Sequence, residues 1–349
     1  MYHVQLTDSL FPAVTEPPIW EISVGEQLRK TAVAHPNAEA LVEITQANEV
    51  GRRFTYTELL AQSERLALSL ASHFAKGERV CVWSPNSPEW VLMEYACALA
   101  GLVLVTANPA FQPKELRYVL EQSGAVALFH VQGYRGNPMA AIAAAALEGN
   151  AQVRRVVDMD DHTALFAQGA NAAALPEVSA GDPIQIQYTS GTTGFPKGAV
   201  LSHRGLLNNA RFYADRLGVT QASTWANPMP MFHTSSCGMI TLGTMQAGAR
   251  MVLISLFDAG ALNRLIAAEQ ITIMLGVPTM VQAMLEAHQQ TASDLSSLTM
   301  VASGGSMVAP ELVRRAYDVI GCDFNTIYGQ TEHSPVIIPG VIENPNLMA

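Results

Sequence analysis

Short apolar strands alternate with clearly bounded helices along almost the whole chain. A capping box formed by Thr55 and Glu58 opens one helix, and Ser87 followed by Pro88 opens the next, which Gly101 closes. Between such helices lie apolar runs of the length and composition of buried strands. Strands that alternate with helices in this way predict an α/β fold in layers, with largely parallel sheets.

This alternation predicts where the individual elements lie. Glycine is common just after a helix because it adopts positive φ without steric cost, and Gly101, Gly124 and Gly218 occupy such positions. The expected strands are residues 79–83, 102–105, 125–129, 184–188, 251–254, 271–275, 298–302 and 324–328. The expected helices are residues 59–70, 88–100, 113–123, 140–147, 206–217, 262–269, 280–288 and 311–320.

A chain of 349 residues is too long for one simple core, so we expect two lobes. With 49% hydrophobic and 14% charged residues, the chain has the composition of a globular protein rather than a disordered one. Residues 217–249 contain no Asp, Glu, Lys or Arg. Their prolines, glycines and polar residues interrupt any membrane span, so this segment is expected to be a buried wall of a cleft.

Residues 188–198, Y-T-S-G-T-T-G-F-P-K-G, have the composition of a loop that holds phosphate oxygens. Gly191 and Gly194 let several backbone N–H groups converge on one anion, because they lack a Cβ and tolerate positive φ. Lys197 adds a point charge suited to phosphate. Hydroxyl donors come from Thr189, Ser190, Thr192 and Thr193.

The surroundings of this loop favour nucleotide binding over an ordinary surface turn. Residues 184–188 alternate like a strand, and Ser202 can cap a helix after the loop. We therefore expect the order strand, loop, helix. The loop differs from the common NTPase fingerprint, since Pro196 stands where that pattern has its second glycine and Gly198 where it has Ser or Thr.

Charge and cysteine usage exclude some classes of partner. The net charge of −10 argues against nucleic acid. An acidic chain that binds ATP must concentrate positive potential locally, as Lys197 would do here. Cys81, Cys97, Cys237 and Cys322 form no C-x-x-C pair, which indicates free thiols in a reducing cytosol. The N-terminus lacks the basic start and apolar run of a signal peptide.

The loop at 188–198 resembles the signature Y-T-S-G-T-T-G-x-P-K-G of the adenylate-forming enzymes. That superfamily includes acyl-CoA synthetases, peptide-synthetase adenylation domains and beetle luciferases. Other segments resemble further motifs of the superfamily in the same order. They are F-T-Y-T-E-L at 54–59, the segment 101–109, P-M-F-H at 230–233, G-V-P-T at 276–279, S-G-G-S at 303–306 and Y-G-Q-T-E at 328–332.

The resemblance covers nearly the whole chain and implies the large N-terminal domain of such an enzyme, with two α/β lobes. The implied division is an N-terminal arm with part of the second lobe at 1–56, the first lobe with the phosphate loop at 57–218, and the remainder of the second lobe at 219–349. No lysine follows Lys197, and the family's T-G-D motif does not occur. We therefore expect a truncated chain without the C-terminal domain, which would be a poor catalyst alone.

The resemblance also implies roles for single residues. Lys197 would hold the β- and γ-phosphates of ATP, Thr331 would bond the α-phosphate, and Glu332 would hold Mg²⁺ through one carboxylate oxygen. His233 would form a gate between the substrate carboxylate, the α-phosphate and a thiol tunnel. The other nucleotide-binding residues implied are Thr189, Ser190, Gly191, Thr192, Thr193, Gly194, Gly304, Gly305, Ser306, Tyr328 and Gly329.

Simpler explanations exist for several of these positions. An isolated histidine such as His233 is often a packed core residue, and a tyrosine at a strand end, such as Tyr328, is commonly core. His203 and Arg204 are expected to be structural or surface residues. The P-M-F-H context nevertheless favours the gate at His233, and Gly304 and Gly305 could form an ordinary turn. His233 and Gly304 are also expected to line the acyl pocket. For the other expected wall residues, simple packing is as good an explanation as ligand contact; they are Ser235, Ser236, Val277, Pro278, Thr279, Pro335 and Val336.

The expected function is ATP-dependent activation of a carboxylic acid, fatty or aromatic, to acyl-AMP and then to a coenzyme A thioester. ATP, Mg²⁺ and coenzyme A are the expected cofactors, and the expected location is cytoplasmic. A non-catalytic module that binds nucleotide or acyl-adenylate is an alternative from another class. A peptide-synthetase adenylation domain is a third, but His233 stands where that subset usually has an Asp to pair the substrate amine.

Overall fold

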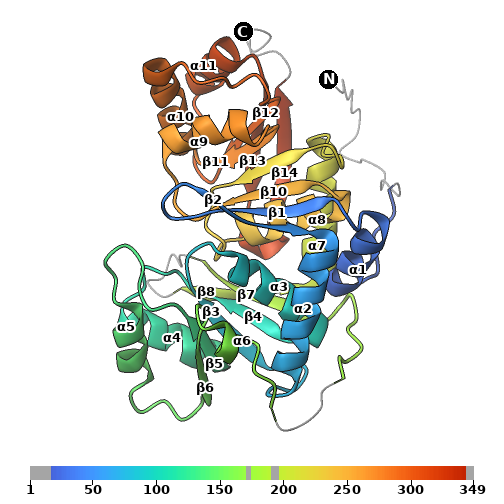
Figure 1. Cartoon of the computed structure of the whole chain (residues 1–349), viewed down its shortest axis with the longest axis vertical. Helices are drawn as coiled ribbons and strands as arrows, with labels where there is room; N and C mark the ends of the chain where they lie inside the picture. The colour runs from blue at the N-terminus through green and yellow to red at the C-terminus, as the bar shows by residue number, and fades with distance from the viewer. Residues whose placement is uncertain (1–16, 170–173, 190–195, 343–349) are drawn as a thin grey trace, which may run out of the picture.

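The computed structural model describes residues 17–169, 174–189 and 196–342, which form two sheets with helices around and between them (Figure 1). The larger sheet has eight strands, parallel except for its outermost pair at each edge. Their order is β14 (Val336–Ile342), β13 (Asp323–Gly329), β12 (Met300–Gly304), β11 (Ile273–Gly276), β9 (Thr224–Asn227), β10 (Arg250–Ile254), β1 (Glu39–Ile44) and β2 (Val50–Thr55).

The smaller sheet has six strands and is built from the segment between β2 and β9. It is parallel except for one antiparallel pair at its edge. The prediction of an α/β fold with largely parallel sheets is therefore confirmed. The strand order is β6 (Arg155–Asp158), β5 (Ala125–His130), β3 (Arg79–Trp83), β4 (Val103–Thr106), β7 (Pro183–Thr189) and β8 (Lys197–Ser202).

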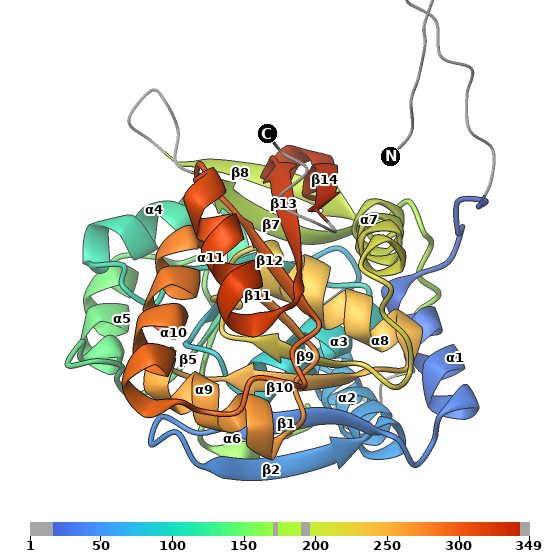
Figure 2. The ribbon, with the colours of Figure 1, turned by 90° about the horizontal axis from the view of Figure 1, so that it is seen from above.

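Helices form a central layer between the sheets and cover both outer faces. The central elements are α1 (Val24–Ala34), α2 (Tyr56–Ala71), α3 (Pro88–Ala100), α7 (His203–Arg216), the π-helix η1 (Ser235–Thr241) and α8 (Leu242–Ala247). The outer face of the larger sheet carries α9 (Ala259–Ala268), α10 (Pro278–Thr291) and α11 (Pro310–Ile320) (Figure 2). The outer face of the smaller sheet carries α4 (Pro113–Ser123) and α5 (Met139–Leu147). Two further helices are short, α6 (His162–Leu165) and η2 (Thr331–His333).

The core follows from these layers. Every residue of α3 is buried, as expected for a helix that is apolar on all sides and packed in the middle of a molecule. One large hydrophobic cluster joins the central helices to both sheets. A second cluster lies between the larger sheet and α9, α10 and α11. The two sheets are thus joined through one common core.

The expected helix boundaries are confirmed where capping signals are strong. The capping box of Thr55 and Glu58 is formed at the start of α2. Ser87 accepts a hydrogen bond from the backbone of Trp90 at the start of α3, and Gly101 ends that helix in the left-handed conformation. Local side-chain chemistry sets these ends, so they could be predicted without tertiary information.

The expected order of strand, loop and helix around the phosphate loop is wrong in one respect. Residues Lys197–Ser202 form the strand β8, which pairs antiparallel with β7, so the loop joins two strands of a hairpin. The run of Ala199, Val200 and Leu201 pairs with β7 along the sheet edge. The helix α7 begins only after that strand, and Ser202 caps it as expected. The phosphate loop therefore does not lie at a helix N-terminus.

The expected division into residues 1–56, 57–218 and 219–349 stays a prediction. Strands β1 and β2 join the larger sheet, and the strands from β3 to β8 form the smaller one. Helix α7 packs against η1 and α8 rather than lying only against the smaller sheet. The central helices therefore contact elements of both halves.

Candidate functional site

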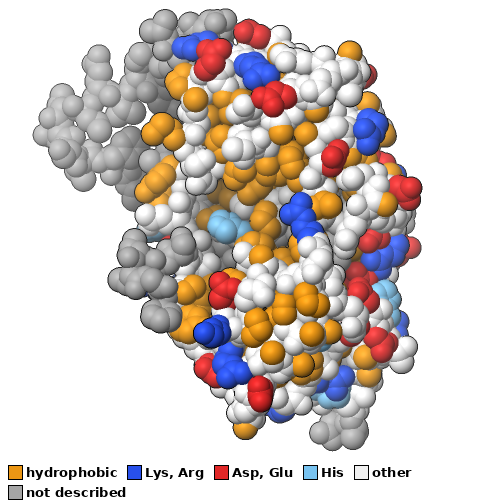
Figure 3. Space-filling view, turned by 90° about the vertical axis from the view of Figure 1, so that its left-hand side faces the viewer, with side chains coloured by type: hydrophobic (Ala, Val, Ile, Leu, Met, Phe, Trp, Pro, Cys, Tyr) orange, Lys and Arg blue, Asp and Glu red, His pale blue; other side chains and the backbone are white. Residues whose placement is uncertain are grey.

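The segments singled out by sequence follow the carboxyl ends of parallel strands. Strands β11, β12 and β13 end at Gly276, Gly304 and Gly329, each of which lies in the first two residues of one of the motifs. In the smaller sheet, β7 ends at Thr189, directly before the phosphate loop. Ligands of open α/β sheets bind beyond the carboxyl ends of the strands. Figure 3 shows that one face of the molecule is hollowed across its middle, with apolar side chains along the upper wall.

The base of the phosphate hairpin is tied to α4. Thr189 and Lys197 face each other as the last described pair of β7 and β8, and Lys197 is exposed. The hydroxyl of Tyr118 donates to the carbonyl oxygen of Pro196 at 3.0 Å, and the hydroxyl of Tyr188 donates to Gln122 Oε1. These bonds hold both strands of the hairpin against one helix. The predicted phosphate ligands Ser190, Gly191, Thr192, Thr193 and Gly194 lie outside the described residues.

The turn η2 brings Thr331 and Glu332 to this hairpin. It lies against β8, although more than a hundred residues separate the two segments. Asn209 of α7 fixes the turn, because its Nδ2 donates to the carbonyl oxygens of His333 at 3.3 Å and Val336 at 2.9 Å. Thr331 is buried and Glu332 is exposed. Two predicted nucleotide-binding segments are therefore neighbours in space.

Glu332 has the chemistry that a magnesium ligand needs. Its carboxylate makes no hydrogen bond or ion pair with a residue of the described ranges. Within those same ranges, no group of three or more His, Cys, Asp or Glu side chains could hold a metal ion by itself. Mg²⁺ commonly binds through one or two carboxylates together with water and substrate phosphates. A single free carboxylate beside the phosphate hairpin fits that mode.

Glycine is required at Gly304 and at Gly305 for different structural reasons. A Cβ on Gly304 would lie 2.5 Å from the carbonyl oxygen of Ile327 in β13, so this position needs glycine because two strands approach closely. A large side chain at Gly304, an expected wall of the acyl pocket, would therefore disturb the sheet before it could block an acyl chain. Gly305 has a positive φ of 77°, and a Cβ there would lie 3.7 Å from Val277. Ser306 is exposed.

Tyr328 is not a core residue, because 56% of it is exposed at the end of β13. Its hydroxyl accepts a long hydrogen bond of 3.4 Å from Gln330. A Cβ on the next residue, Gly329, would collide with the carbonyl oxygen of Pro335, which accounts for glycine at that position. An exposed aromatic ring at this strand end is free to stack on a planar ligand.

His233 lies at the entrance of the π-helix η1. Its Nδ1 accepts a hydrogen bond from the backbone N–H of Ser235 at 3.3 Å and lies 3.2 Å from the hydroxyl of the same residue. Because a backbone N–H can only donate, the proton of the neutral ring is on Nε2. The ring reaches solvent, but the surrounding protein atoms displace water and hold the pKa of His233 below its usual 6.5. His233 is thus a neutral hydrogen-bond donor at pH 7.

The other expected pocket walls are only partly brought together. Val277 caps α10 and lies near Gly305, whereas Thr279 in the first turn of that helix is exposed. Pro335 is buried, and a Cβ added to Gly238 of η1 would lie 4.0 Å from its Cδ. The remaining wall residues are Ser235, which contacts His233, Pro278, which opens α10, and Val336, whose backbone N–H donates to Asn209.

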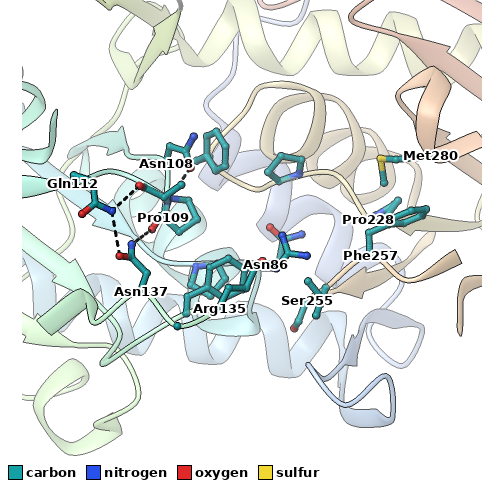
Figure 4. A pocket seen from close by; sticks show the side chains of 17 residues that line it. Asn86, Asn108, Pro109, Gln112, Arg135, Asn137, Pro228, Ser255, Phe257 and Met280 are labelled. Atoms are coloured by element: carbon teal, nitrogen blue, oxygen red, sulfur yellow. Dashed lines mark hydrogen bonds between the residues drawn. The ribbon is translucent and has the colours of Figure 1, made fainter. Parts of the chain in front are cut away.

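A cavity of about 700 Å³ lies where the two sheets meet. Loops after β3, β4 and β5 form one side, and loops after β9 and β10 form the other together with Met280 of α10. Figure 4 shows Gln112 and Asn137 on one side, Phe257 and Met280 opposite, and Asn86 between them. Sequence reasoning missed Asn86. The usable signal was a polar residue three positions after a buried strand.

Arg135 supplies the positive charge of this cavity. It lies at the tip of a short turn between Tyr134 and Asn137. Its guanidinium lies 5.7 Å from the centre of the Tyr134 ring and forms no ion pair with a carboxylate of the described residues. In a chain with a net charge of −10, an unpaired arginine at a cavity favours an anionic ligand.

Several residues that sequence alone could have made catalytic are structural. Cys81, Cys97, Cys237 and Cys322 are free and buried, and burial raises the pKa of each thiol. His203 is fully buried, and its Nδ1 accepts a hydrogen bond from the backbone of Val24. Arg204 forms an exposed ion pair with Glu21. In the described ranges, no helix combines the length and the apolar character that a membrane crossing requires.

Comparison with known proteins gives a consistent result. The family model described as AMP-binding enzyme matches residues 28–347. YngI of Bacillus subtilis, which is named as a candidate acyl-CoA synthetase, is 32% identical over 345 residues, or 90% of this chain and 62% of its own length. The human mitochondrial medium-chain acyl-CoA ligase ACSF2 is 33% identical over 349 residues, or 90% of this chain and 56% of its own. The chain thus spans about 60% of the length of these relatives.

Solved structures resemble the chain in the same way. The N-terminal domain of FACL13 from Mycobacterium tuberculosis superimposes with a TM-score of 0.79 and 25% identity, over 91% of this chain and 79% of that domain. A protein of Rhodopseudomonas palustris CGA009, named as a candidate long-chain fatty-acid CoA ligase, gives 0.78 and 26%, over 92% of this chain and 79% of its own.

Proposed function

The chain belongs to the AMP-binding enzyme family, and on that premise we propose that it activates a carboxylic acid with ATP and passes the acyl group to coenzyme A. The acid first attacks the α-phosphate of ATP, which gives acyl-AMP and releases pyrophosphate. The thiol of coenzyme A then attacks the acyl carbon, which gives the thioester and releases AMP. The protein contributes mainly position and charge stabilisation.

The observation that carries this proposal is the contact between η2 and β8. It brings η2, with Thr331 and the free carboxylate of Glu332, against β8, the strand that begins at the exposed Lys197 and leads out of the phosphate loop. A lysine and a carboxylate carried by two contacting elements suit a triphosphate with its magnesium ion. The lysine neutralises phosphate charge, and the carboxylate attracts the metal.

We assign each residue a role within this reaction. Lys197 binds the β- and γ-phosphates, Thr331 donates its hydroxyl to the α-phosphate, and Glu332 ligates Mg²⁺, which would neutralise the phosphates when bound. Tyr328 stacks on adenine, which its exposure permits. The neutral His233 donates from Nε2 to the developing charge at the acyl centre rather than transferring a proton.

We further propose that the cavity between the sheets receives coenzyme A. Its volume of about 700 Å³ and the unpaired Arg135 suit a phosphorylated ligand. Pro230 and Phe232 line it, and His233 is the next residue in the chain. The residues 228–233 would therefore separate the thiol side from the adenylate side. We call them the gate segment.

The substrate and the cellular setting are also proposals. The names of the relatives, a medium-chain acyl-CoA ligase among them, support a fatty acid more than an aromatic one. The length of those relatives supports the view that this chain is the N-terminal part of a longer enzyme. Four free thiols agree with a reducing cytosol as the location.

Titration of the chain with Mg·ATP, followed by calorimetry, tests the nucleotide site. Lys197→Ala should weaken binding by at least about tenfold, because it removes a charge that bonds phosphate. Lys30→Ala is the matched control, since it removes the same charge from the exposed face of α1. Equal affinities in the three proteins would contradict the proposed phosphate site.

Acid-dependent release of pyrophosphate tests the reaction itself. Residues 1–349 alone should turn over slowly, since loss of one well-placed electrostatic group costs about a hundred- to a thousand-fold in rate. The C-terminal segment of YngI, added in trans or fused, should raise the rate with a medium-chain fatty acid. A rate ordinary for a complete synthetase without that segment would disprove the expected dependence on a second domain. Nucleotide binding without any acid-dependent release in either form would favour the non-catalytic alternative.

A further inference from the structure

The side chain of Asn86 joins the two halves of the molecule at the gate segment. Asn86 lies after β3 of the smaller sheet and is 7% exposed. Its Nδ2 donates to the carbonyl oxygens of Met229 at 2.8 Å and Ile254 at 3.0 Å. Its Oδ1 accepts from the backbone N–H of Met231 at 2.7 Å. All three partners belong to segments that leave the larger sheet, after β9 and at the end of β10.

This arrangement uses the full chemistry of an asparagine side chain. Both N–H donors and the carbonyl oxygen have backbone partners, so a buried polar side chain and three buried backbone groups are satisfied together. Aspartate could keep the bond to Met231 but would turn an oxygen toward two carbonyl groups. An aliphatic residue would leave all three backbone groups without a partner, which is costly in a buried site.

Two neighbouring strands hold the same region. Thr106, the last residue of β4, donates its hydroxyl to the carbonyl oxygen of Phe232 at 2.9 Å. Gln187 of β7 donates to the sulfur of Cys237 at 3.0 Å, and that thiol lies 3.4 Å from the carbonyl oxygen of His233. Strands β3, β4 and β7 are adjacent in the sheet. Three neighbouring strand ends thus support one segment of the other half.

The gate segment combines residues of the cavity wall with the residue assigned to the acyl centre, His233. Pro228, Pro230 and Phe232 line the cavity, and Asn86 lines it as well. His233 follows directly and leads into η1, a π-helix. Helices of this rare type occur frequently at functional sites, because they are retained where a local backbone geometry matters. A displacement of residues 229–231 would therefore move the cavity wall and His233 together.

We propose that Asn86 is the positioning residue that fixes the gate segment, so that one side chain of the smaller sheet sets both the cavity wall and the placement of His233. The proposal rests on the proposed function only for the identity of the ligands on either side. Thr106 assists through the next backbone carbonyl. Neither residue touches the reacting atoms, and both act through the backbone of residues 229–232.

The first experiment needs no ligand. Amide hydrogen exchange of the gate segment and titration of His233 by NMR are measured in Asn86→Ala, a neutral variant small enough for water to replace the lost amide. Thr106→Val removes a single bond and serves if Asn86→Ala folds poorly. Asn263→Ala is the control. Asn263 of α9 is also buried, and its side chain donates to the backbone carbonyl of Met284 in α10, away from the gate segment.

Exchange at Met231 should rise about tenfold or more in Asn86→Ala, because its acceptor is lost. The pKa of His233 should rise toward 6.5, because the protein atoms packed around the ring would be displaced and more water would surround it. Asn263→Ala should change neither quantity at the gate, even if it lowers the unfolding free energy by as much. Unchanged exchange and an unchanged His233 titration in both gate variants would overturn the proposal.

The second experiment connects the gate to the ligands. Affinities for coenzyme A and for Mg·ATP are measured by calorimetry on the same proteins. Asn86→Ala should weaken coenzyme A binding by roughly tenfold and leave Mg·ATP binding unchanged, because the gate segment lines the cavity and none of its residues is assigned to the triphosphate. Equal loss of both ligands would overturn the selective role of Asn86. If the unaltered chain binds no coenzyme A, the proposed thiol site fails, while hydrogen exchange still decides whether Asn86 positions the gate.

Discussion

The hydroxyl of Tyr118 donates to the carbonyl oxygen of Pro196 across 3.0 Å, and so α4 holds the second strand of the phosphate hairpin at its start. Tyr188, near the end of the first strand, bonds to Gln122 one helical turn further along α4. Among the described strands, none lies on the outer side of β8, so a hairpin at this sheet edge has few other restraints. The two tyrosines therefore fix the two strand ends between which the loop lies.

Tyr118→Phe should weaken Mg·ATP binding by about fivefold, because one hydrogen bond of roughly 1 kcal/mol no longer restrains the loop. Calorimetry of the purified chain measures the affinity, and thermal unfolding shows whether the fold persists. Tyr317→Phe on α11 is the control, since it removes the same hydroxyl far from the hairpin. An affinity equal to that of the control would show that α4 does not position the loop.

Glu332→Gln should separate the binding of metal from the binding of nucleotide. The amide keeps the size of the side chain but loses the charge that attracts Mg²⁺, so affinity for Mg·ATP should fall about tenfold while affinity for ATP in EDTA stays the same. Glu311→Gln on the exposed surface of α11 controls for the change in net charge. Equal loss with and without magnesium would argue against Glu332 as the metal ligand.

Gly304→Ala should destabilise the fold rather than block a substrate selectively. The added Cβ would meet the carbonyl oxygen and Cβ of Ile327, so two parallel strands must separate, at a cost of about 1–3 kcal/mol. Urea unfolding measures the change. Gly181→Ala is the control, because an added Cβ at that position has no heavy atom within 4 Å. Normal stability together with reduced acid binding would instead support a direct role of Gly304 in the acyl pocket.

His203 should make the fold sensitive to mild acid. Burial lowers the pKa of His203 to about 4, against 6.5 for an exposed histidine. The folded state therefore binds this proton more weakly than the unfolded state. Stability from His203 is complete above pH 6.5 and is lost as the pH falls from 6.5 to 4, by up to about 3 kcal/mol.

His203→Asn tests this pH dependence, since an asparagine oxygen can still accept from Val24 but does not titrate. Unfolding free energies of both proteins are compared at pH 7.5, 5.5 and 4.5. The difference between them isolates His203 from Glu94, whose buried carboxyl has a raised pKa and titrates in the same experiment. A difference that does not change with pH would disprove the effect.

Local chemistry in the sequence determined the elements and the family resemblance. Capping side chains fixed the starts of α2 and α3, and Gly101 and Gly124 fixed the ends of α3 and α4. These signals act within a few residues. The motif around Lys197 indicated phosphate binding before any geometry was known. The strand β8 was not predicted. Its pairing with β7 is a contact between two segments, whereas the local signal in this part of the sequence was the helix cap at Ser202.

Tertiary structure alone decided which polar groups meet. Nothing local relates Asn86 to Met231, or η2 to β8, since the contacts join segments more than a hundred residues apart. It also decided that Gly304 is packed against Ile327 whereas Tyr328 is exposed. Hydrophobic periodicity specifies which face of each element is buried, but the partner across the core depends on how whole layers pack. The residues of the site were therefore readable from the sequence, and the support that positions them was not.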